Sequence, residues 1–206
     1  MRFNKPLTYI LDSQPKIICL RLLCNYPTEI NGRQLSKIVK LSPTTVHKAM
    51  KELANEQIVV LKNYGNSHVY ELNKTNRIVS EILKPMFNNE KILLDKFIKN
   101  VVKGIKKSEL KDTIFSIVLF GSVQDGSEKP QSDIDLCVVV KESKDKKRVE
   151  NLMFNINFSL KGSIGMSIAP YVKTVGEFKK DKELSVIRAI LKSHRVIWGE
   201  PMESML

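Results

Sequence analysis

Features typical of secreted and membrane proteins are scarce in this chain of 206 residues. It has only 3 cysteines, and Cys19, Cys24 and Cys137 show no spacing typical of a zinc site or a disulfide framework. The apolar runs are too short to cross a bilayer. The most apolar N-terminal segment, residues 17–23, is interrupted by Arg21 and lacks a cleavage site. We therefore expect a soluble cytoplasmic protein without a membrane partner, whose cysteines are small core residues.

Acidic residues are outnumbered by basic ones. The chain has 22 Asp and Glu against 34 Lys and Arg, which gives a net charge of +12. Residues 1–80 hold 12 basic and 5 acidic side chains, a net charge of +7, and the other 126 residues carry +5. The N-terminal region is therefore more basic per residue, as expected for a region that contacts a polyanion. A lysine-rich composition of the whole chain is the alternative explanation.

A polar loop that contains glycine joins two apolar segments in the second half of the chain. It reads FGSVQDGSEKPQSDIDL over residues 120–136. Because alternate residues of a strand share a face, Asp133 and Asp135 are expected to project together while Ile134 and Leu136 face the core. Neighbouring carboxylates repel each other unless a cation lies between them, and Mg²⁺ or Mn²⁺ prefers oxygen ligands. We predict a divalent metal site at these two aspartates.

The start of this loop favours binding of a phosphate group. Gly121 allows a sharp turn at the end of the first strand, and Ser122 opens the next helical turn. Backbone amides exposed at such a place favour anionic groups. The loop therefore has a metal-binding position and a phosphate-binding position close together in sequence.

These residues resemble the motif of the DNA polymerase beta-like nucleotidyltransferases, and most closely the minimal nucleotidyltransferases. The likeness rests on Gly-Ser, ten intervening residues and Asp-Ile-Asp-Leu, within residues 121–136, and on Gly126 and Ser132, which match a glycine and a serine of that subgroup. Such a pattern is far more specific than Asp-x-Asp alone, which would favour an acidic surface turn.

The resemblance implies roles for five residues. Gly121, Ser122 and Ser132 would bind the nucleotide, and Asp133 and Asp135 would be catalytic residues that hold Mg²⁺ or Mn²⁺. The implied reaction transfers a nucleoside monophosphate from an NTP, such as ATP, to a hydroxyl group. Some members of the subgroup are antitoxins that adenylylate a HEPN-type ribonuclease, so a HEPN-type protein is an implied partner.

The N-terminal region has the signals of three helices. An apolar helix over residues 17–23 is followed by Asn25-Tyr26-Pro27. The second helix is expected to begin at Asn31, whose side chain can cap it. The third is expected to begin after Ser42, with Pro43 at its first position.

A hairpin is expected after the third helix. Two apolar segments, residues 58–61 and 68–72, flank the sequence Asn-Tyr-Gly-Asn at 63–66 and place Lys62 at the tip. Three helices and a hairpin in this order, over about residues 10–75, resemble a winged helix-turn-helix domain. Duplex DNA is the implied partner, with the third helix in the major groove.

The resemblance assigns DNA contacts to two groups of side chains. Expected base contacts are Thr44, Thr45 and His47. Expected phosphate contacts are Lys48, Lys51 and Lys62. A winged helix that binds only proteins, with its lysines exposed to solvent, is the alternative.

An amphipathic connector is expected over residues 81–108. Its apolar positions recur at helical spacing from Leu94 to Ile105, and Pro85 is expected to interrupt the helical stretch before it. We expect this helix to pack against the C-terminal sheet, while a role in homodimerisation stays open.

The remaining segments predict a small mixed sheet flanked by helices. A helix from Ser143 to Leu160 is expected to end at Gly162, and a third strand to run from Ile164 to Val172. Two further helices and a short strand at 196–198 complete an α/β (α+β) fold typical of nucleotidyltransferases.

The third strand departs from the family pattern. Nucleotidyltransferases of this kind usually place a third carboxylate there, and the best-matching position is Ser167. Without that acid, the two aspartates can hold a metal and a nucleotide, but activation of the acceptor hydroxyl is weakened. Asp125 or Glu177 are candidates to replace it in space.

Three parts are therefore expected: a winged helix at 1–80, the connector at 81–108 and a nucleotidyltransferase-like domain at 109–206. Together they predict a DNA-binding protein that binds Mg-NTP and transfers its nucleoside monophosphate. The alternative is a transcriptional regulator whose degenerate nucleotidyltransferase domain only senses a nucleotide or serves as a scaffold.

Overall fold

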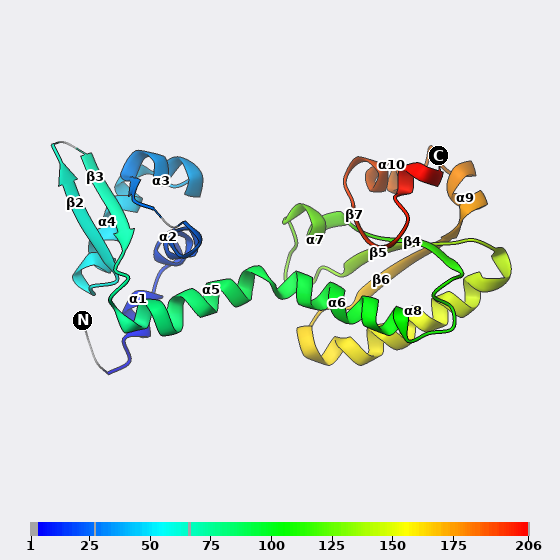
Figure 1. The fold of residues 1–206 in the computed structure, drawn as a ribbon. Coiled ribbons are helices and arrows are strands. Elements are labelled where there is room, and N and C mark those ends of the chain that lie inside the picture. Colours follow the sequence, from blue (N-terminus) through cyan, green and yellow to red (C-terminus); the bar gives the residue numbers. More distant parts are fainter. Residues whose placement is uncertain (1–3, 27, 66, 206) are drawn as a thin grey trace. The chain divides into compact units, whose positions relative to one another are not determined.

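The computed structural model describes residues 4–26, 28–65 and 67–205, apart from the side chains of residues 161, 163 and 164 (Figure 1). The chain divides into two compact units, Met1–Leu93 and Leu94–Leu206. The fold mixes helices with two small sheets, as the sequence predicts. No helix in the described ranges is both long enough and apolar enough to span a membrane.

Unit 1 combines short helices with a three-stranded antiparallel sheet. Its helices are α1 (Leu7–Ile10), α2 (Gln14–Asn25), α3 (Gly32–Val39) and α4 (Pro43–Asn55). Its strands are β1 (Ile30–Asn31), β2 (Val59–Tyr64) and β3 (Ser67–Leu72), in the order β1-β3-β2. The core between helices and sheet includes Cys19, Leu20 and Tyr70.

Local side-chain chemistry sets the start of α3 and of α4. The Asn31 side chain accepts a hydrogen bond from the Gln34 amide at 2.9 Å. The Ser42 hydroxyl accepts one from the Thr45 amide at 3.1 Å. Both caps satisfy amides that the first helical turn leaves unpaired, and both were predicted.

The hairpin extends beyond the expected turn. Lys62 lies inside β2, paired with Val69 of β3, so the prediction that it forms the tip is wrong. The reason is that backbone pairing continues to Tyr64 on one strand and starts at Ser67 on the other.

The helical stretch that follows β3 is continuous across Pro85. A π-helical turn, η1 (Val79–Leu83), leads directly into α5 (Lys84–Lys91), with Pro85 in the first turn of α5. The expected interruption at Pro85 is therefore wrong. A π turn is wider than an α turn, which gives the backbone room next to a residue without an amide hydrogen. The helix ends instead at Lys91, and Ile92 separates it from α6.

Unit 2 contains the mixed sheet that the sequence predicts. Its strands are β4 (Ile114–Phe120), β5 (Ile134–Val140), β6 (Ile168–Thr174) and β7 (Arg195–Gly199), in the order β6-β5-β4-β7. Strands β5 and β6 are parallel, and the other pairs are antiparallel. Its helices are α6 (Leu93–Lys106, from the unit boundary), α7 (Gly121–Asp125), α8 (Ser143–Ile164), α9 (Val175–Lys180), α10 (Ser185–Lys192) and the 3-10 turn η2 (Met202–Met205).

Each face of this sheet has its own core (Figure 1). Helices α6 and α8 cover one face, where Val101 and Ile105 of α6 are buried against the strands. The expected packing on the sheet is thus confirmed for α6, whereas the earlier part of the expected connector packs in the core of unit 1 through Leu83 and Phe87. Helices α9 and α10 and the turn η2 cover the other face, where Cys137 is buried.

Helix α8 is longer than predicted. It continues through Gly162 to Ile164, and Gly165 follows with a left-handed φ of +69°. Gly165 is therefore where the chain leaves the helix, because a left-handed residue after the last turn is a common helix end. As a result β6 begins at Ile168 rather than at Ile164.

Candidate functional site

The backbone of Gly121 lies directly against the Asp135 carboxylate in the candidate site. Gly121 follows β4 with a φ of +73°, and a Cβ built on it would lie 2.2 Å from Asp135 Oδ2. Phe120 pairs with Asp135 across β4 and β5, which brings the two residues together at this end of the sheet. Glycine is therefore needed both for its backbone conformation and for the space it leaves.

The two aspartates have the alternation that the sequence predicts. Ile134 and Leu136 are buried, while Asp135 is half-buried and Asp133 is exposed. Burial, and then the charge of Asp133, raise the pKa of Asp135. Within the described ranges neither carboxylate has a hydrogen-bond or ion-pair partner.

This arrangement is suited to one divalent cation. Two neighbouring carboxylates without a counter-charge disfavour joint ionisation, and a bound cation would relieve both desolvation and repulsion. Mg²⁺ is commonly held by one or two carboxylates, with waters and substrate phosphates as its other ligands. The described residues contain no group of three or more His, Cys, Asp or Glu side chains that could form a complete protein cage.

No acid occupies the position next to these aspartates on β6. Ala169 is the residue paired with Asp135 across the parallel strands. Ser167 lies one residue before β6, where its carbonyl accepts a hydrogen bond from the Ile134 amide at 2.8 Å. The structure therefore offers two neutral side chains where the family pattern has a carboxylate.

Glu177 cannot take the place of the missing acid. It follows Thr174, which pairs with Val140 at the far end of β5. At about 3.3 Å per residue, that pair is roughly 17 Å along the strand from Asp135. Glu177 accepts hydrogen bonds from the Thr174 amide at 2.8 Å and from Lys146 at 2.9 Å, and these lower its pKa.

Asp125, the other candidate replacement, is already hydrogen-bonded. It is the last residue of α7, and its carboxylate accepts a bond of 2.7 Å from the Ser193 hydroxyl. This bond ties α7 to the segment that precedes β7.

The two predicted nucleotide-binding serines differ in their surroundings. Ser132 closes a turn, because its hydroxyl accepts from the Lys129 amide and its own amide donates to the Lys129 carbonyl, both at 2.9 Å. Ser122 lies in the first turn of the short helix α7 and is half-buried. Of the two serines, Ser122 is thus the one that lies next to Gly121 and its contact with Asp135.

The predicted DNA contacts on α4 are partly exposed. Thr44, Lys48 and Lys51 are exposed, and Thr45 and His47 are half-buried. The Thr45 hydroxyl shares a 2.7 Å hydrogen bond with that of Ser42.

Ion pairing divides the cations of unit 1 into two groups. Lys62 is paired with Glu71 at 2.9 Å and with Glu29, and Lys16 with Glu52 at 2.8 Å. A second group, on α3, at its end and on α4, has no ion-pair partner in the described parts of the chain: Arg33, Lys37, Lys40, Lys48 and Lys51. These two helices and the residue after α3 thus carry five unpaired cations, and Lys5, Lys84 and Lys91 are further cations of unit 1 without an ion pair in the described ranges.

A cluster of rings that the sequence did not predict lies beside α4. The His47 and His68 rings stack with centroids 4.7 Å apart and an angle of 27° between their planes. His47 Nδ1 lies 3.0 Å from the buried Tyr70 hydroxyl, and His68 Nδ1 lies 2.7 Å from Asn63 Oδ1. The cluster joins helix and hairpin through residues more than 20 positions apart, so no local sequence signal announces it.

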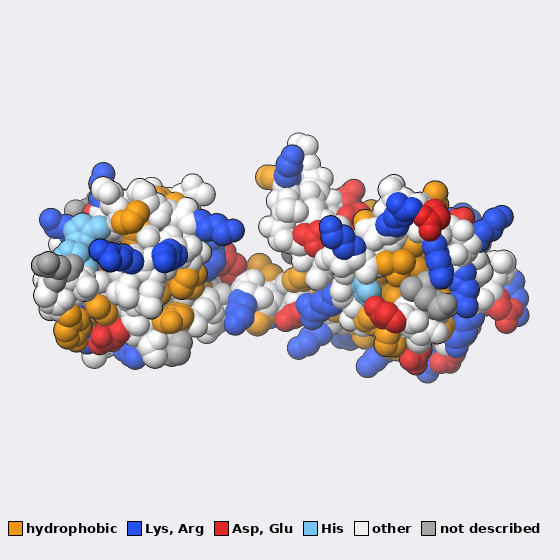
Figure 2. Space-filling view, turned by 90° about the horizontal axis from the view of Figure 1, so that it is seen from above, with side chains coloured by type: hydrophobic (Ala, Val, Ile, Leu, Met, Phe, Trp, Pro, Cys, Tyr) orange, Lys and Arg blue, Asp and Glu red, His pale blue; other side chains and the backbone are white. Residues whose placement is uncertain are grey.

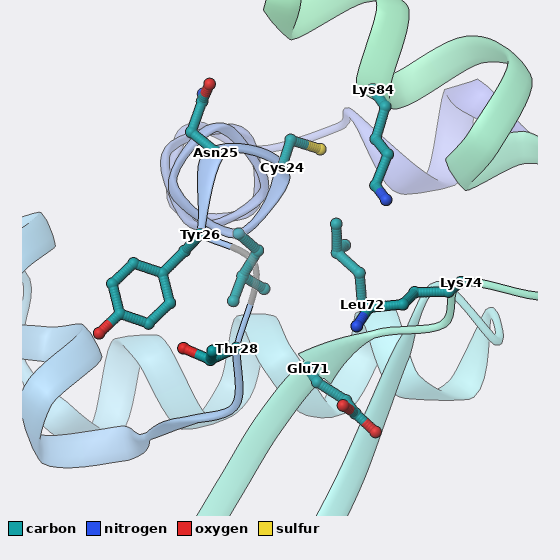
Figure 3. Close-up of a pocket in the computed structure, with 9 residues that line it drawn as sticks. Cys24, Asn25, Tyr26, Thr28, Glu71, Leu72, Lys74 and Lys84 are labelled. Carbon is teal, nitrogen blue, oxygen red and sulfur yellow. The ribbon is translucent and has the colours of Figure 1, made fainter.

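A cavity of about 230 Å³ lies at the end of α2 (Figure 3). Its lining includes Cys24, Lys74 and Lys84, and burial raises the pKa of the Cys24 thiol to about 11. The carboxyl end of a helix carries unpaired carbonyl groups that attract cations. Two cations and Glu71 thus lie around a thiol whose pKa burial raises.

Comparison with known proteins finds a family match in the second unit. A family model described as "Nucleotidyltransferase domain" matches residues 98–197. A solved structure described as "Crystal structure of the toxin-antitoxin with AMP-PNP" is 17% identical, with a TM-score of 0.34, over 52% of this chain and 77% of that chain. No curated protein matches the chain. Residues 98–197 therefore match a nucleotidyltransferase domain, in agreement with the motif.

Replacing Gly121 by alanine should destabilise the protein through a clash with Asp135. We expect the free energy of unfolding to fall by about 3 kcal/mol, from backbone strain and overpacking together. Gly126→Ala is the matched control, because Gly126 has a φ of +67° but nothing within 4 Å of an added Cβ. That variant should lose only about 1 kcal/mol.

Urea unfolding measures both variants, and a double-mutant cycle locates the cause. Asp135→Ala removes the carboxylate, so Gly121→Ala should cost at least about 1 kcal/mol less in that background. Equal costs in both backgrounds would show that the contact with Asp135 does not constrain Gly121.

Proposed function

We propose that the nucleotidyltransferase domain binds an NTP together with one Mg²⁺ or Mn²⁺ at Asp133 and Asp135. The observation that carries this proposal is the pair of unpartnered carboxylates, one of them packed against the glycine that begins α7. The Asp135 carboxylate fills the side on which Gly121 lacks a side chain, so a phosphate chain would approach the backbone at Gly121 from the other side. Ser122 follows in the same turn and supplies a hydroxyl donor.

The proposed reaction is transfer of a nucleoside monophosphate to a hydroxyl acceptor. A bond forms between the acceptor oxygen and the α-phosphorus, the bond to pyrophosphate breaks, and the hydroxyl proton passes to a base. Asp133 and Asp135 would hold the divalent cation, which would neutralise charge on the triphosphate when bound. With Ala169 and Ser167 at the position of the third acid, solvent must accept the proton, and transfer is slow.

The same neutral residues favour a second candidate function for this domain, which is nucleotide sensing without transfer. Holding a metal and a triphosphate needs two carboxylates and a close backbone approach, whereas turnover also needs a group that deprotonates the acceptor. The two candidates share the binding step and differ in the group that Ala169 and Ser167 fail to provide.

For unit 1 we propose a winged helix that binds duplex DNA and acts in transcriptional regulation. The unpaired cations on α3 and α4 support this, since phosphate contacts require ammonium and guanidinium groups that are not already neutralised. Thr44, Thr45 and His47 are the proposed base contacts, with Lys48 and Lys51 on phosphates. Lys62 is left out, because Glu29 and Glu71 already occupy its ammonium group.

Nucleotide binding should depend on Asp133. Titration calorimetry with Mg-ATP should show binding by the wild type and a loss of at least about tenfold in affinity for Asp133→Asn, because one metal ligand is removed. Asp125→Asn is the control: it removes a carboxylate that Ser193 already occupies and should bind like the wild type. Heat from both variants equal to that of the wild type would exclude the proposed site.

Restoring the third acid should raise the transfer rate. Ala169→Asp places a carboxylate beside Asp135 on the parallel neighbour strand. Labelled ATP with Mg²⁺ and candidate acceptors should then show transfer at least about tenfold faster than the wild type, the range of general-base contributions being 10²–10⁴. Unchanged transfer by a variant that still binds Mg-ATP would mean that the missing acid is not what limits the reaction.

Duplex binding should depend on the unpaired lysines of α4. The double variant Lys48→Ala, Lys51→Ala should bind a mixed-sequence duplex more weakly, and the slope of log K against log salt should become shallower by about 2, near 0.9 per lost phosphate contact. Fluorescence anisotropy at several salt concentrations measures both. Lys62→Ala should leave the slope unchanged, and a wild-type slope in the double variant would rule out these contacts.

A further inference from the structure

A large cavity of unit 1 lies where α3, α4 and β3 meet. It has a volume of about 590 Å³, and its lining includes Arg33, Thr44, His47, Ser67, His68 and Tyr70. None of the residues that line it is Asp or Glu. A cavity with one guanidinium, two imidazoles and several hydroxyl groups, and without a carboxylate, selects against cations and accepts an anion.

The orientation of the two imidazoles is set by their partners. Each ring uses its Nδ1, His47 towards Tyr70 and His68 towards Asn63. Each ring therefore keeps its Nε2 available for a ligand. Stacking at 4.7 Å holds the rings side by side, and Figure 2 shows these histidines (pale blue) together at the surface, beside Lys and Arg side chains (blue).

Arg33 and the helix starts add donors on the other side of the cavity. Arg33 is exposed and has no side-chain partner within the described ranges. The caps Asn31 and Ser42 take the amides of Gln34 and Thr45. The amides of Arg33 and Thr44, earlier in each first turn, remain among those that a helix leaves unpaired.

We propose that this cavity is a phosphate-binding site, in which Arg33 and the Nε2 atom of His68 hold the phosphate oxygens, while His47 stacks on His68 and stays the base contact proposed above. Guanidinium groups suit phosphate because their donors match its oxygens in pairs. The phosphate comes either from a duplex backbone or from a free nucleotide. The first source rests on the DNA binding proposed above, and the second is independent of it.

The test compares two single-charge variants of the same helix. Arg33→Ala and Lys37→Ala each remove one exposed, unpaired cation of α3, but only Arg33 lines the cavity. Anisotropy with a mixed-sequence duplex and calorimetry with ATP in the absence of divalent metal are run on full-length protein. The absence of metal suppresses binding at the aspartate pair, so the second arm reports on unit 1.

For a duplex phosphate, Arg33→Ala should lower DNA affinity at least about tenfold and Lys37→Ala only about twofold, because a charge-assisted hydrogen bond is stronger than a screened surface charge. His68→Ala should also weaken binding, because it removes the Nε2 that contacts the phosphate. His68 is exposed, so its replacement should leave the fold intact. For a free nucleotide, the same ranking should appear with ATP and not with DNA.

Equal losses for Arg33→Ala and Lys37→Ala in both arms would overturn the phosphate site. If the wild type binds the duplex while this equality holds, the DNA function of unit 1 stands without the cavity. If the wild type binds no duplex but binds ATP through Arg33, the cavity stands and the DNA function fails.

Discussion

The close contact between Gly121 and the Asp135 carboxylate is the constraint on which the candidate site depends. An added Cβ at Gly121 would lie 2.2 Å from Asp135 Oδ2, so the end of β4 and the start of β5 can meet in this way only with glycine at that position. The contact also keeps the carboxylate half-buried, which together with Asp133 raises its pKa. The sheet thus holds a negative charge where water solvates it poorly, an arrangement that a cation stabilises.

The rest of unit 2 supports this contact from both faces of the sheet. The apolar residues that alternate with the aspartates, Ile134 and Leu136, are buried under α6 and α8. The opposite face, covered by α9, α10 and η2, carries Cys137 and Val139 in its core. Because β5 is buried on both faces beyond Asp135, its register cannot slip without moving a charged residue into the core. The position of the carboxylates therefore follows from the packing of the whole sheet.

Features set by neighbours in sequence could be predicted, whereas those set by distant neighbours could not. The caps Asn31 and Ser42 act within three residues, and the alternation around Ile134 is local, so both followed from the sequence. The end of α8 did not, because two glycines lie near it and only the backbone conformation of Gly165 distinguishes them.

The surroundings of Lys62 also depend on residues that are distant in sequence and could not be predicted. Its carboxylate partners, Glu29 and Glu71, come from other segments of the chain, and only the register of β2 and β3 brings them within reach. A lysine near a hairpin turn predicts a free charge, and the fold neutralises it. The cluster of His47, His68 and Tyr70 was missed for the same reason, since it forms only when the hairpin lies against α4.

Charge left without a partner links the two proposed sites, each considered within its own unit. The ion pairs of unit 1 satisfy Lys16 and Lys62 but leave the cations of α3 and α4 unpaired, and the hydrogen bonds of unit 2 satisfy Asp125 and Glu177 but leave Asp133 and Asp135. Unpaired charges of one sign repel one another and reduce stability, and a ligand of opposite charge removes that cost when it binds. At the two proposed sites, a phosphate-bearing ligand and a metal ion would each stabilise the fold by removing this cost.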